Sequence, residues 1–232
     1  MKEPTALLTR PAAQSAELAA ALSGCSVVIS PLIEIVPCDV GVDLDGFDLL
    51  LFASQNAVLA ARRFGLAGRR AFAVGPRTAA VAAAQGMEVM VASGNADGLV
   101  AAVSGLPGAG RVLFLRGRHS RGDVAGRLAR AGIDIREAVI YDQRARPLSR
   151  EAVALLRGRA PVVLPLFSPR SALLMAQGAQ TAGAVAPLVI VALSRAVAAA
   201  WNGPRPADVA VAGRPSAEEM VALTRARLRL RA

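Results

Sequence analysis

The amino-acid sequence predicts an α/β fold built on parallel sheets. Short runs of Val, Leu, Ile and Phe alternate with alanine-rich helical stretches along the whole chain, a pattern typical of parallel strands connected by helices. Hydrophobic residues make up 54% of the chain but aromatic residues only 3%, which favours closely packed helices on sheets over an aromatic-rich β sandwich. The 232 residues allow one large domain or two of roughly 100–130 residues.

The predicted strands are short apolar runs bounded by turn residues. They cover residues 5–8, 26–30, 48–52, 71–74, 87–91, 111–115, 133–141, 162–167, 188–192 and 208–211. Pro11 and Pro76 open helices that end near Gly24 and Gly86, and Gly132 ends another, because proline suits the first turn of a helix and glycine its end. These signals place a helix between most pairs of successive strands.

An internal repeat predicts two similar domains. Residues 52–57 parallel residues 167–172 at a distance of 115, residues 75–78 parallel 193–196 at 118, and residues 97–100 parallel 218–221 at 121. Residues 6–10 also resemble residues 112–116, and each of these two segments is followed by a helix, a glycine and a strand. The resulting order, A–B–A′–B′, permits either sequential domains or an interleaved pairing of B with A′ and of A with B′. Loops near 37–46 and 143–147 are the natural crossings.

Charge and composition narrow the classes of partner. Lys and Arg number 27 against 17 Asp and Glu, a net charge of +10, and Lys2 is the single lysine. Guanidinium groups bind carboxylates in bidentate fashion. The sequence contains no basic run interleaved with aromatic residues, the pattern that would favour nucleic-acid binding. A multiply carboxylated small molecule is therefore at least as good a candidate partner as nucleic acid. No membrane span is expected, since no apolar stretch reaches roughly 20 residues.

The start of the chain lacks the features of a secretory signal, so a cytoplasmic location is expected. Cys25 and Cys38 are too few for a disulfide framework and are predicted to be free thiols. His119, the one histidine, follows Arg118 and is expected to be a solvated loop residue. A polyhistidine metal site is thereby excluded, and no glycine-rich phosphate loop is present.

Polar residues gather where predicted strands end and helices begin, the edge at which open α/β sheets bind ligands. They are Thr9, Arg10, Ser54, Gln55, Asn56, Arg77, Thr78, Arg116, Ser168, Arg170, Ser171, Ser194 and Arg195. Helix capping is an alternative role for the Ser, Thr and Asn residues. Tyr141, the one tyrosine, ends an apolar strand just before a crossing; its phenol can donate a proton to a leaving hydroxyl, although plain packing is an equal alternative.

Several of these segments together resemble the uroporphyrinogen-III synthase family. They are Leu7-Leu8-Thr9-Arg10-Pro11, Phe52-Ala53-Ser54-Gln55-Asn56-Ala57-Val58, Ala73-Val74-Gly75-Pro76-Arg77-Thr78-Ala79, Leu115-Arg116-Gly117, Val139-Ile140-Tyr141 and Phe167-Ser168-Pro169. The resemblance spans nearly the whole chain. It implies two flavodoxin-like domains interleaved in sequence, residues 1–36 with 146–232 and residues 39–142, joined by a two-strand linker at 37–38 and 143–145 with a cleft between them.

The resemblance also implies a reaction. Family members convert hydroxymethylbilane, a linear tetrapyrrole polycarboxylate, into uroporphyrinogen III with loss of water and inversion of the last ring, and no cofactor or metal is implied. Tyr141 and Thr78 are then the candidate catalytic residues. The candidate substrate-binding residues are Arg10, Ser54, Gln55, Asn56, Arg116, Gly117, Ser168, Ser171 and Ser194.

One position departs from the family pattern. Ala196 stands where some members carry a threonine, so the site equivalent to Thr78 in the second repeat lacks a hydroxyl unless Ser194 substitutes. We expect a monomer that makes transient contact with the bilane-forming enzyme and has no nucleic-acid or membrane partner. The alternatives are a non-catalytic hinge protein that binds a polycarboxylate and, third, a nucleic-acid-binding protein.

Overall fold

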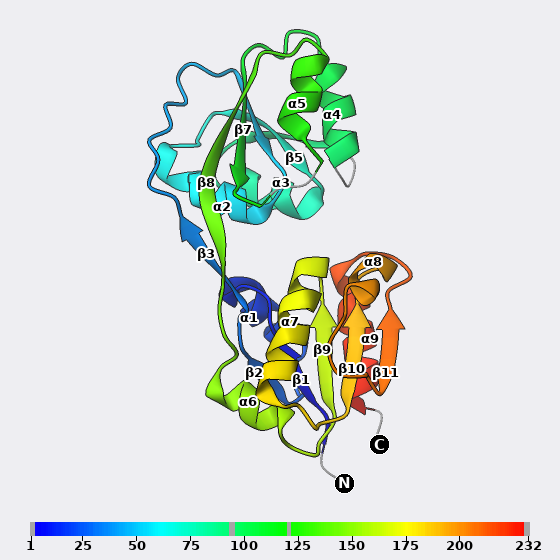
Figure 1. The fold of residues 1–232 in the computed structure, drawn as a ribbon. Coiled ribbons are helices and arrows are strands. Elements are labelled where there is room, and N and C mark those ends of the chain that lie inside the picture. The colour runs from blue at the N-terminus through cyan, green and yellow to red at the C-terminus, as the bar shows by residue number, and fades with distance from the viewer. Residues whose placement is uncertain (1–2, 93–95, 120–121, 230–232) are drawn as a thin grey trace. The chain divides into compact units, whose positions relative to one another are not determined.

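The structure, a computed structural model, describes residues 3–92, 96–119 and 122–229. Its strands form two sheets with mostly parallel neighbours, flanked by helices (Figure 1), so the predicted α/β class is confirmed. The chain divides into two compact units, Met1–Glu34 with Arg144–Ala232 and Ile35–Gln143. Each unit contains one of the two sheets, and the boundaries between the units fall within two strands of the second sheet.

The first unit contains a five-stranded sheet in the order β11-β10-β9-β1-β2. Its neighbouring strands run parallel. The strands are β1 Thr5–Leu8, β2 Val27–Ile29, β9 Val162–Leu166, β10 Leu188–Ala192 and β11 Asp208–Val211. The predicted strands at residues 5–8, 188–192 and 208–211 agree with the structure to the residue.

Helices cover both faces of this sheet (Figure 1). They are α1 Ala12–Ala21, α6 Arg150–Leu156, α7 Pro169–Ala182, α8 Arg195–Ala199 and α9 Ala217–Arg229. Leu7 points into the core beneath α6, α7 and α8, whereas its neighbours Ala6 and Leu8 point toward α1 and α9. Because β1 is buried on both faces, its sequence is apolar almost throughout rather than alternating.

The second unit contains a six-stranded sheet in the order β3-β8-β7-β4-β5-β6. The strands are β3 Ile33–Pro37, β4 Leu49–Phe52, β5 Arg70–Val74, β6 Glu88–Ala92, β7 Val112–Gly117 and β8 Ile135–Ala145. From β8 to β6 the neighbouring strands run parallel. The helices are α2 Gln55–Ala61, α3 Pro76–Ala83, α4 Ala96–Ser104 and α5 Val124–Arg130, with a 3-10 turn η1 at Arg62–Phe64.

The core of the second unit also lies on both faces of its sheet. Leu113 and Leu115 of β7 pack with α2 and α3, while Val112 and Phe114 pack with α4 and α5. The glycines predicted to end helices, Gly24, Gly86 and Gly132, all have positive φ, a conformation that glycine adopts without strain.

The sequence repeat corresponds to equivalent places in the two sheets. Segment 52–57 begins at the end of β4 and segment 167–172 follows β9, and both strands are central in their sheets. The order β2-β1-β9-β10-β11 in one sheet matches β8-β7-β4-β5-β6 in the other, element for element. The drift in the repeat distance is therefore explained by loops of different length around a common strand order.

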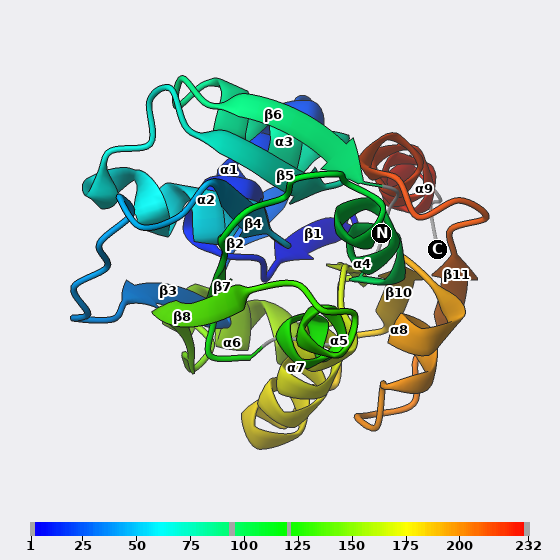
Figure 2. The same ribbon diagram turned by 90° about the horizontal axis from the view of Figure 1, so that it is seen from above.

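The chain passes between the units at two neighbouring strands, β3 and β8. No strand was predicted at residues 33–37, yet these residues form β3, and β8 extends to Ala145 instead of ending at Tyr141. β3 and β8 lie side by side (Figures 1 and 2), with Cys38 N–H donating to Ile140 at 2.9 Å and Arg146 N–H donating to Leu32 at 2.9 Å. Residues 38–46 form no helix or strand, in agreement with the predicted loop, but residues 143–145 of the second predicted loop belong to β8. The loop prediction was wrong for these three residues because pairing between distant segments supplies backbone partners that local sequence does not reveal.

Three smaller expectations concern the cysteines, membrane spans and metal sites. Cys25 and Cys38 are free thiols, as predicted. Among the described residues, no helix combines the length and apolarity that a membrane span needs. The same residues contain no cluster of three or more His, Cys, Asp or Glu side chains arranged to hold a metal ion.

Candidate functional site

Tyr141 is seated against Gly117 by a β-bulge between β7 and β8. Arg116 pairs with Val139, but the next residue of β7, Gly117, pairs with Tyr141, so Ile140 is left over in the register. The Tyr141 side chain is 3% exposed. A Cβ atom on Gly117 would lie 2.5 Å from Cζ of the ring and 2.8 Å from its hydroxyl, distances that van der Waals repulsion forbids. Glycine at position 117 therefore provides the space that the ring occupies.

The phenol of Tyr141 is hydrogen-bonded to a helix cap. Its hydroxyl lies 3.0 Å from Oγ of Ser54, and this oxygen also accepts the N–H of Ala57 at 3.2 Å as the N-cap of α2. Only one of the two hydroxyl hydrogens can occupy the Tyr141–Ser54 hydrogen bond, so the other can point to a further acceptor. The two hydroxyls are thus held together at the carboxyl edge of the sheet.

The other predicted residues of this unit follow neighbouring strands of the same edge. Thr78 is the third residue of α3, which follows β5, and its side chain is 5% exposed. Gln55 and Asn56 open α2 and are half-buried. Since β8, β7, β4 and β5 are consecutive in the sheet, the candidates from Tyr141 to Thr78 share one edge, and the direct contact that the structure gives is that of Tyr141 with Ser54.

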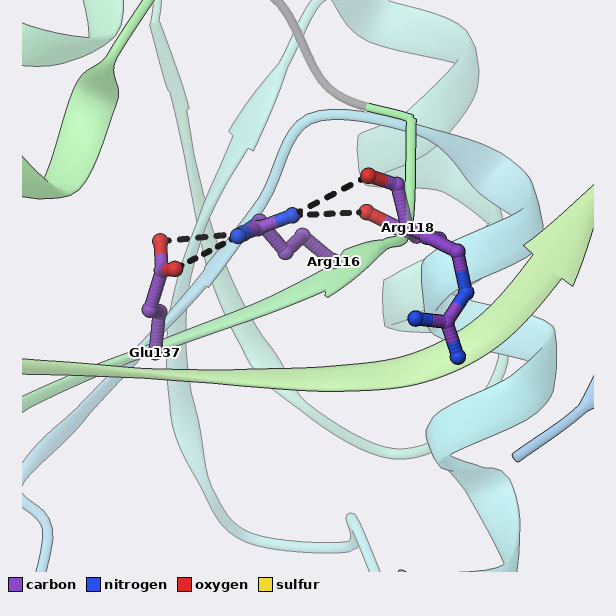
Figure 3. A network of polar contacts seen from close by, with 4 residues as sticks. Arg116, Arg118 and Glu137 are labelled. Atoms are coloured by element: carbon purple, nitrogen blue, oxygen red, sulfur yellow. Dashed lines mark hydrogen bonds and ion pairs between the residues drawn. The ribbon is translucent and has the colours of Figure 1, made fainter. Parts of the chain in front are cut away.

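Arg116 is engaged with the protein itself (Figure 3). Its Nε and Nη2 donate to the two carboxylate oxygens of Glu137 at 2.9 and 2.5 Å, and Nη1 donates to the carbonyl oxygens of Gly117 at 3.0 Å and Arg118 at 3.4 Å. The hydrogen bond to Glu137 raises the pKa of Arg116 above its ordinary value, although partial burial works in the opposite direction. Contact of Arg116 with a substrate carboxylate stays a prediction.

Asp142 follows Tyr141 directly and contacts Arg118 and His119, and sequence reasoning missed it. Its carboxylate lies 3.3 Å from Nε of Arg118 and 3.8 Å from Nε2 of His119. Desolvation raises the pKa of Asp142, but the N–H of Gln143 and the charges of Arg118 and His119 outweigh this effect, and the pKa is lowered. The side chains of Arg118 and His119 are 60% and 52% exposed. The only sequence signal for this group was the position of Asp142 directly after Tyr141.

In the first unit, the predicted serines cap helices. Ser168 and Ser171 form a capping box at the start of α7, with each hydroxyl accepting the other residue's backbone N–H at 3.1 Å. Ser194 caps α8 and accepts the N–H of Val197 at 3.4 Å. The capping alternative is confirmed for these residues and for Ser54, while their contact with a substrate stays a prediction.

The capping box predicts a stability effect. Ser168→Ala is expected to lower the free energy of unfolding by about 1 kcal/mol, because the N–H of Ser171 at the start of α7 loses its partner. Urea unfolding followed by circular dichroism measures the change. Ser104→Ala, at the exposed end of α4, is the matched control and should stay within about 0.5 kcal/mol of the unmodified protein. Equal losses in both variants would contradict the capping role.

Thr78 has a different counterpart from the one that the repeat suggested. Counted from the N-cap, Thr78 is the third residue of α3, and the third residue of α8 is Val197. Both are buried, at 5% and 2% exposed, whereas Ala196 is exposed. The pairing of Thr78 with Ala196 was therefore wrong by one residue, because the turn before α8 is one residue longer than the turn before α3. The position lacks a hydroxyl in either alignment.

Arg10 lies at the end of β1. Its guanidinium stacks over the ring of Phe167 at 4.1 Å from the centroid, and its carbonyl accepts the hydroxyl of Ser15 at 2.8 Å. The preceding residue, Thr9, is 1% exposed, and its Oγ1 is buried with no hydrogen-bond partner among the described residues. The stacking partner Phe167 was not singled out as a site residue from the sequence.

Comparisons with known proteins agree with this arrangement. The structure is similar to that of a uroporphyrinogen-III synthetase from Helicobacter pylori. The match covers 98% of this chain and 100% of that one, at 17% identity and a TM-score of 0.69. A mutant uroporphyrinogen III synthase from Thermus thermophilus covers 98% of each chain at 17% identity and a TM-score of 0.52. At these identities the likeness shows the fold. No curated protein matches the sequence.

The family model described as uroporphyrinogen-III synthase HemD matches residues 14–222. This range contains both sheets almost entirely and all but one of the candidate site residues, Arg10. The chain belongs to the uroporphyrinogen-III synthase family, whose enzymes act in tetrapyrrole synthesis.

Proposed function

We propose that this enzyme closes hydroxymethylbilane into uroporphyrinogen III, with loss of one water and inversion of the terminal pyrrole ring, and that Tyr141 assists departure of the hydroxyl. Family membership supports the reaction. The observation that carries the site assignment is the 3.0 Å hydrogen bond between the buried phenol of Tyr141 and Ser54. Because the reaction eliminates water, we class the enzyme as a hydro-lyase.

The first step needs a proton donor at a defined position. The bond between the terminal methylene carbon and its hydroxyl breaks, the hydroxyl takes up a proton and leaves as water, and loss of the proton on the ring nitrogen gives a neutral azafulvene. When Ser54 donates to Tyr141, the phenolic hydrogen is available for that hydroxyl. The N–H of Ala57 fixes the orientation of Ser54, so the donor keeps its direction.

The later steps need control of conformation more than strong acids or bases. The azafulvene carbon bonds to the substituted carbon of the last ring, and the spiro intermediate fragments and recloses with that ring inverted. The substrate cyclises unaided without inversion, so holding the reacting carbons in place is the main catalytic device. The net charge of +10 suits a substrate with many carboxylates, for which Arg10 is a candidate contact.

Several predictions from the sequence accompany this proposal. We propose that the two compact units correspond to the two interleaved domains. A monomeric state, transient contact with the bilane-forming enzyme and a cytoplasmic location stay predictions. The alternative of a non-catalytic hinge protein has no support in the comparisons.

Product analysis tests the function. Purified protein supplied with freshly generated hydroxymethylbilane is expected to yield mainly the type III isomer, whereas a protein-free control yields type I. Chromatographic separation of the oxidised porphyrins measures the ratio. A non-catalytic binding protein would give type I alone, and that outcome would overturn the proposal.

A further inference from the structure

The bulge that seats Tyr141 interrupts two parallel strands. Ile140 is the extra residue of β8, and both Ile140 and Tyr141 lie in the same hydrophobic cluster, so the usual alternation of side chains between faces stops here. β-bulges are rare in parallel pairs and re-aim the side chains that follow them. Other contacts must therefore stabilise the bulged register relative to a regular parallel pairing.

The ion pair of Arg116 and Glu137 spans the bulge. Glu137 lies on β8 before the extra residue, whereas the carbonyls that accept from Arg116 belong to Gly117, the last residue of β7, and to Arg118, which follows it. Figure 3 shows the guanidinium of Arg116 between the carboxylate on one side and both carbonyls on the other. Beyond the bulge the ladder resumes, with the N–H of Arg118 donating to the carbonyl of Tyr141 at 2.9 Å.

We propose that Glu137 is a positioning residue for Tyr141 and acts through Arg116. The carboxylate sets the plane of the guanidinium, the guanidinium holds the Gly117 carbonyl, and the position of Gly117 decides where the Tyr141 ring packs. The direction of the phenol toward Ser54 follows from that packing. The catalytic part of this inference rests on the proposed function of Tyr141.

The same two strands provide a matched control. Arg111 and Asp134, the residues directly before β7 and β8, form an ion pair at 3.6 Å. This pair lies at the ends of the two strands that are farthest from the bulge. Their side chains are 46% and 66% exposed. Removing that pair by Asp134→Asn disturbs the attraction between the strands without reaching the seat of Tyr141.

Kinetics separate positioning from general stability. Glu137→Gln is expected to lower kcat about tenfold with KM changed less than about twofold, because a displaced reacting group costs rate rather than affinity. Asp134→Asn is expected to keep both constants. The exchanged pair, Arg116→Glu with Glu137→Arg, should regain thermal stability but not kcat, since a carboxylate at 116 cannot donate to the Gly117 carbonyl. Recovery of kcat in the exchanged pair would overturn the proposal.

A second readout needs no substrate. The chain has one tyrosine, so protein labelled with carbon-13 tyrosine gives ring resonances from Tyr141 alone. These resonances are expected to shift in Glu137→Gln and not in Asp134→Asn, and Glu137→Asp serves if the first variant fails to fold. Unchanged resonances in a folded variant, or equal shifts in both, would refute the positioning role. If the unmodified protein makes no type III isomer while the resonances still shift selectively, the proposed function fails and the structural link from Glu137 to Tyr141 stands.

Discussion

Tyr141→Phe is expected to lower kcat by about 100-fold, the lower end of the range for loss of a positioned proton donor. The ring and its packing against Gly117 stay, while the hydroxyl that bonds to Ser54 is lost. KM should change little, because the hydrogen bond to the leaving hydroxyl strengthens only as the bond to carbon breaks. Initial rates over a range of hydroxymethylbilane concentrations, with isomer analysis of the product, measure both constants.

A buried hydroxyl elsewhere controls for general destabilisation. Thr224 of α9 is fully buried and donates to the carbonyl of Met220 at 2.6 Å. Thr224→Val should cost about 1 kcal/mol of stability and leave kcat unchanged at a temperature where both variants are folded. If Tyr141→Phe and Thr224→Val retained equal turnover, Tyr141 would have no chemical role.

Gly117→Ala is expected to reduce both turnover and stability. The added Cβ would lie within 2.8 Å of three atoms of Tyr141, and the buried ring can yield only by leaving its seat. Overpacking of this kind costs about 1–3 kcal/mol, and displacement of the phenol should lower kcat by about 100-fold. Thermal unfolding and the same kinetic assay measure the two losses.

Two comparisons isolate the cause in Gly117→Ala. Gly41 has nothing within 4 Å of the place where a Cβ would be built, so Gly41→Ala should change neither property. In a Tyr141→Phe background, adding Gly117→Ala should lower kcat little further, because the hydroxyl that it would displace is already absent. Full additivity of the two effects on kcat would mean that Gly117 acts independently of Tyr141.

Local sequence predicted the regular elements well. β1, β10 and β11 are short, mostly apolar runs between turn signals, and their bounds were found to the residue. β1 and β10 are buried on both faces, so their composition marks them, whereas β11 is an exposed strand at the edge of the sheet. β3 was missed because its five residues are mostly only partly buried or exposed and depend on β8, which is about 100 residues away in the chain, for their backbone partners.

The contacts of individual site residues depend on segments that are far apart in the sequence. Ser54 could be expected at a helix start, and the structure places it there as a cap. Its bond to Tyr141 joins residues 87 positions apart, and the bond of Arg116 to Glu137 joins residues 21 apart. Neither spacing follows a local period, since each depends on which strands become neighbours.

The sequence by itself therefore determined the α/β class, the internal repeat that indicates two similar domains, and the kinds of residue at the carboxyl edges of the strands. Hydrophobic period and turn chemistry are local properties, which suffice for these features. Only the tertiary structure decided that Gly117 makes room for Tyr141, that Arg116 is held by Glu137, and that Val197 rather than Ala196 matches Thr78. These relations depend on strand register, and a shift of one residue in register moves every later side chain to a different partner.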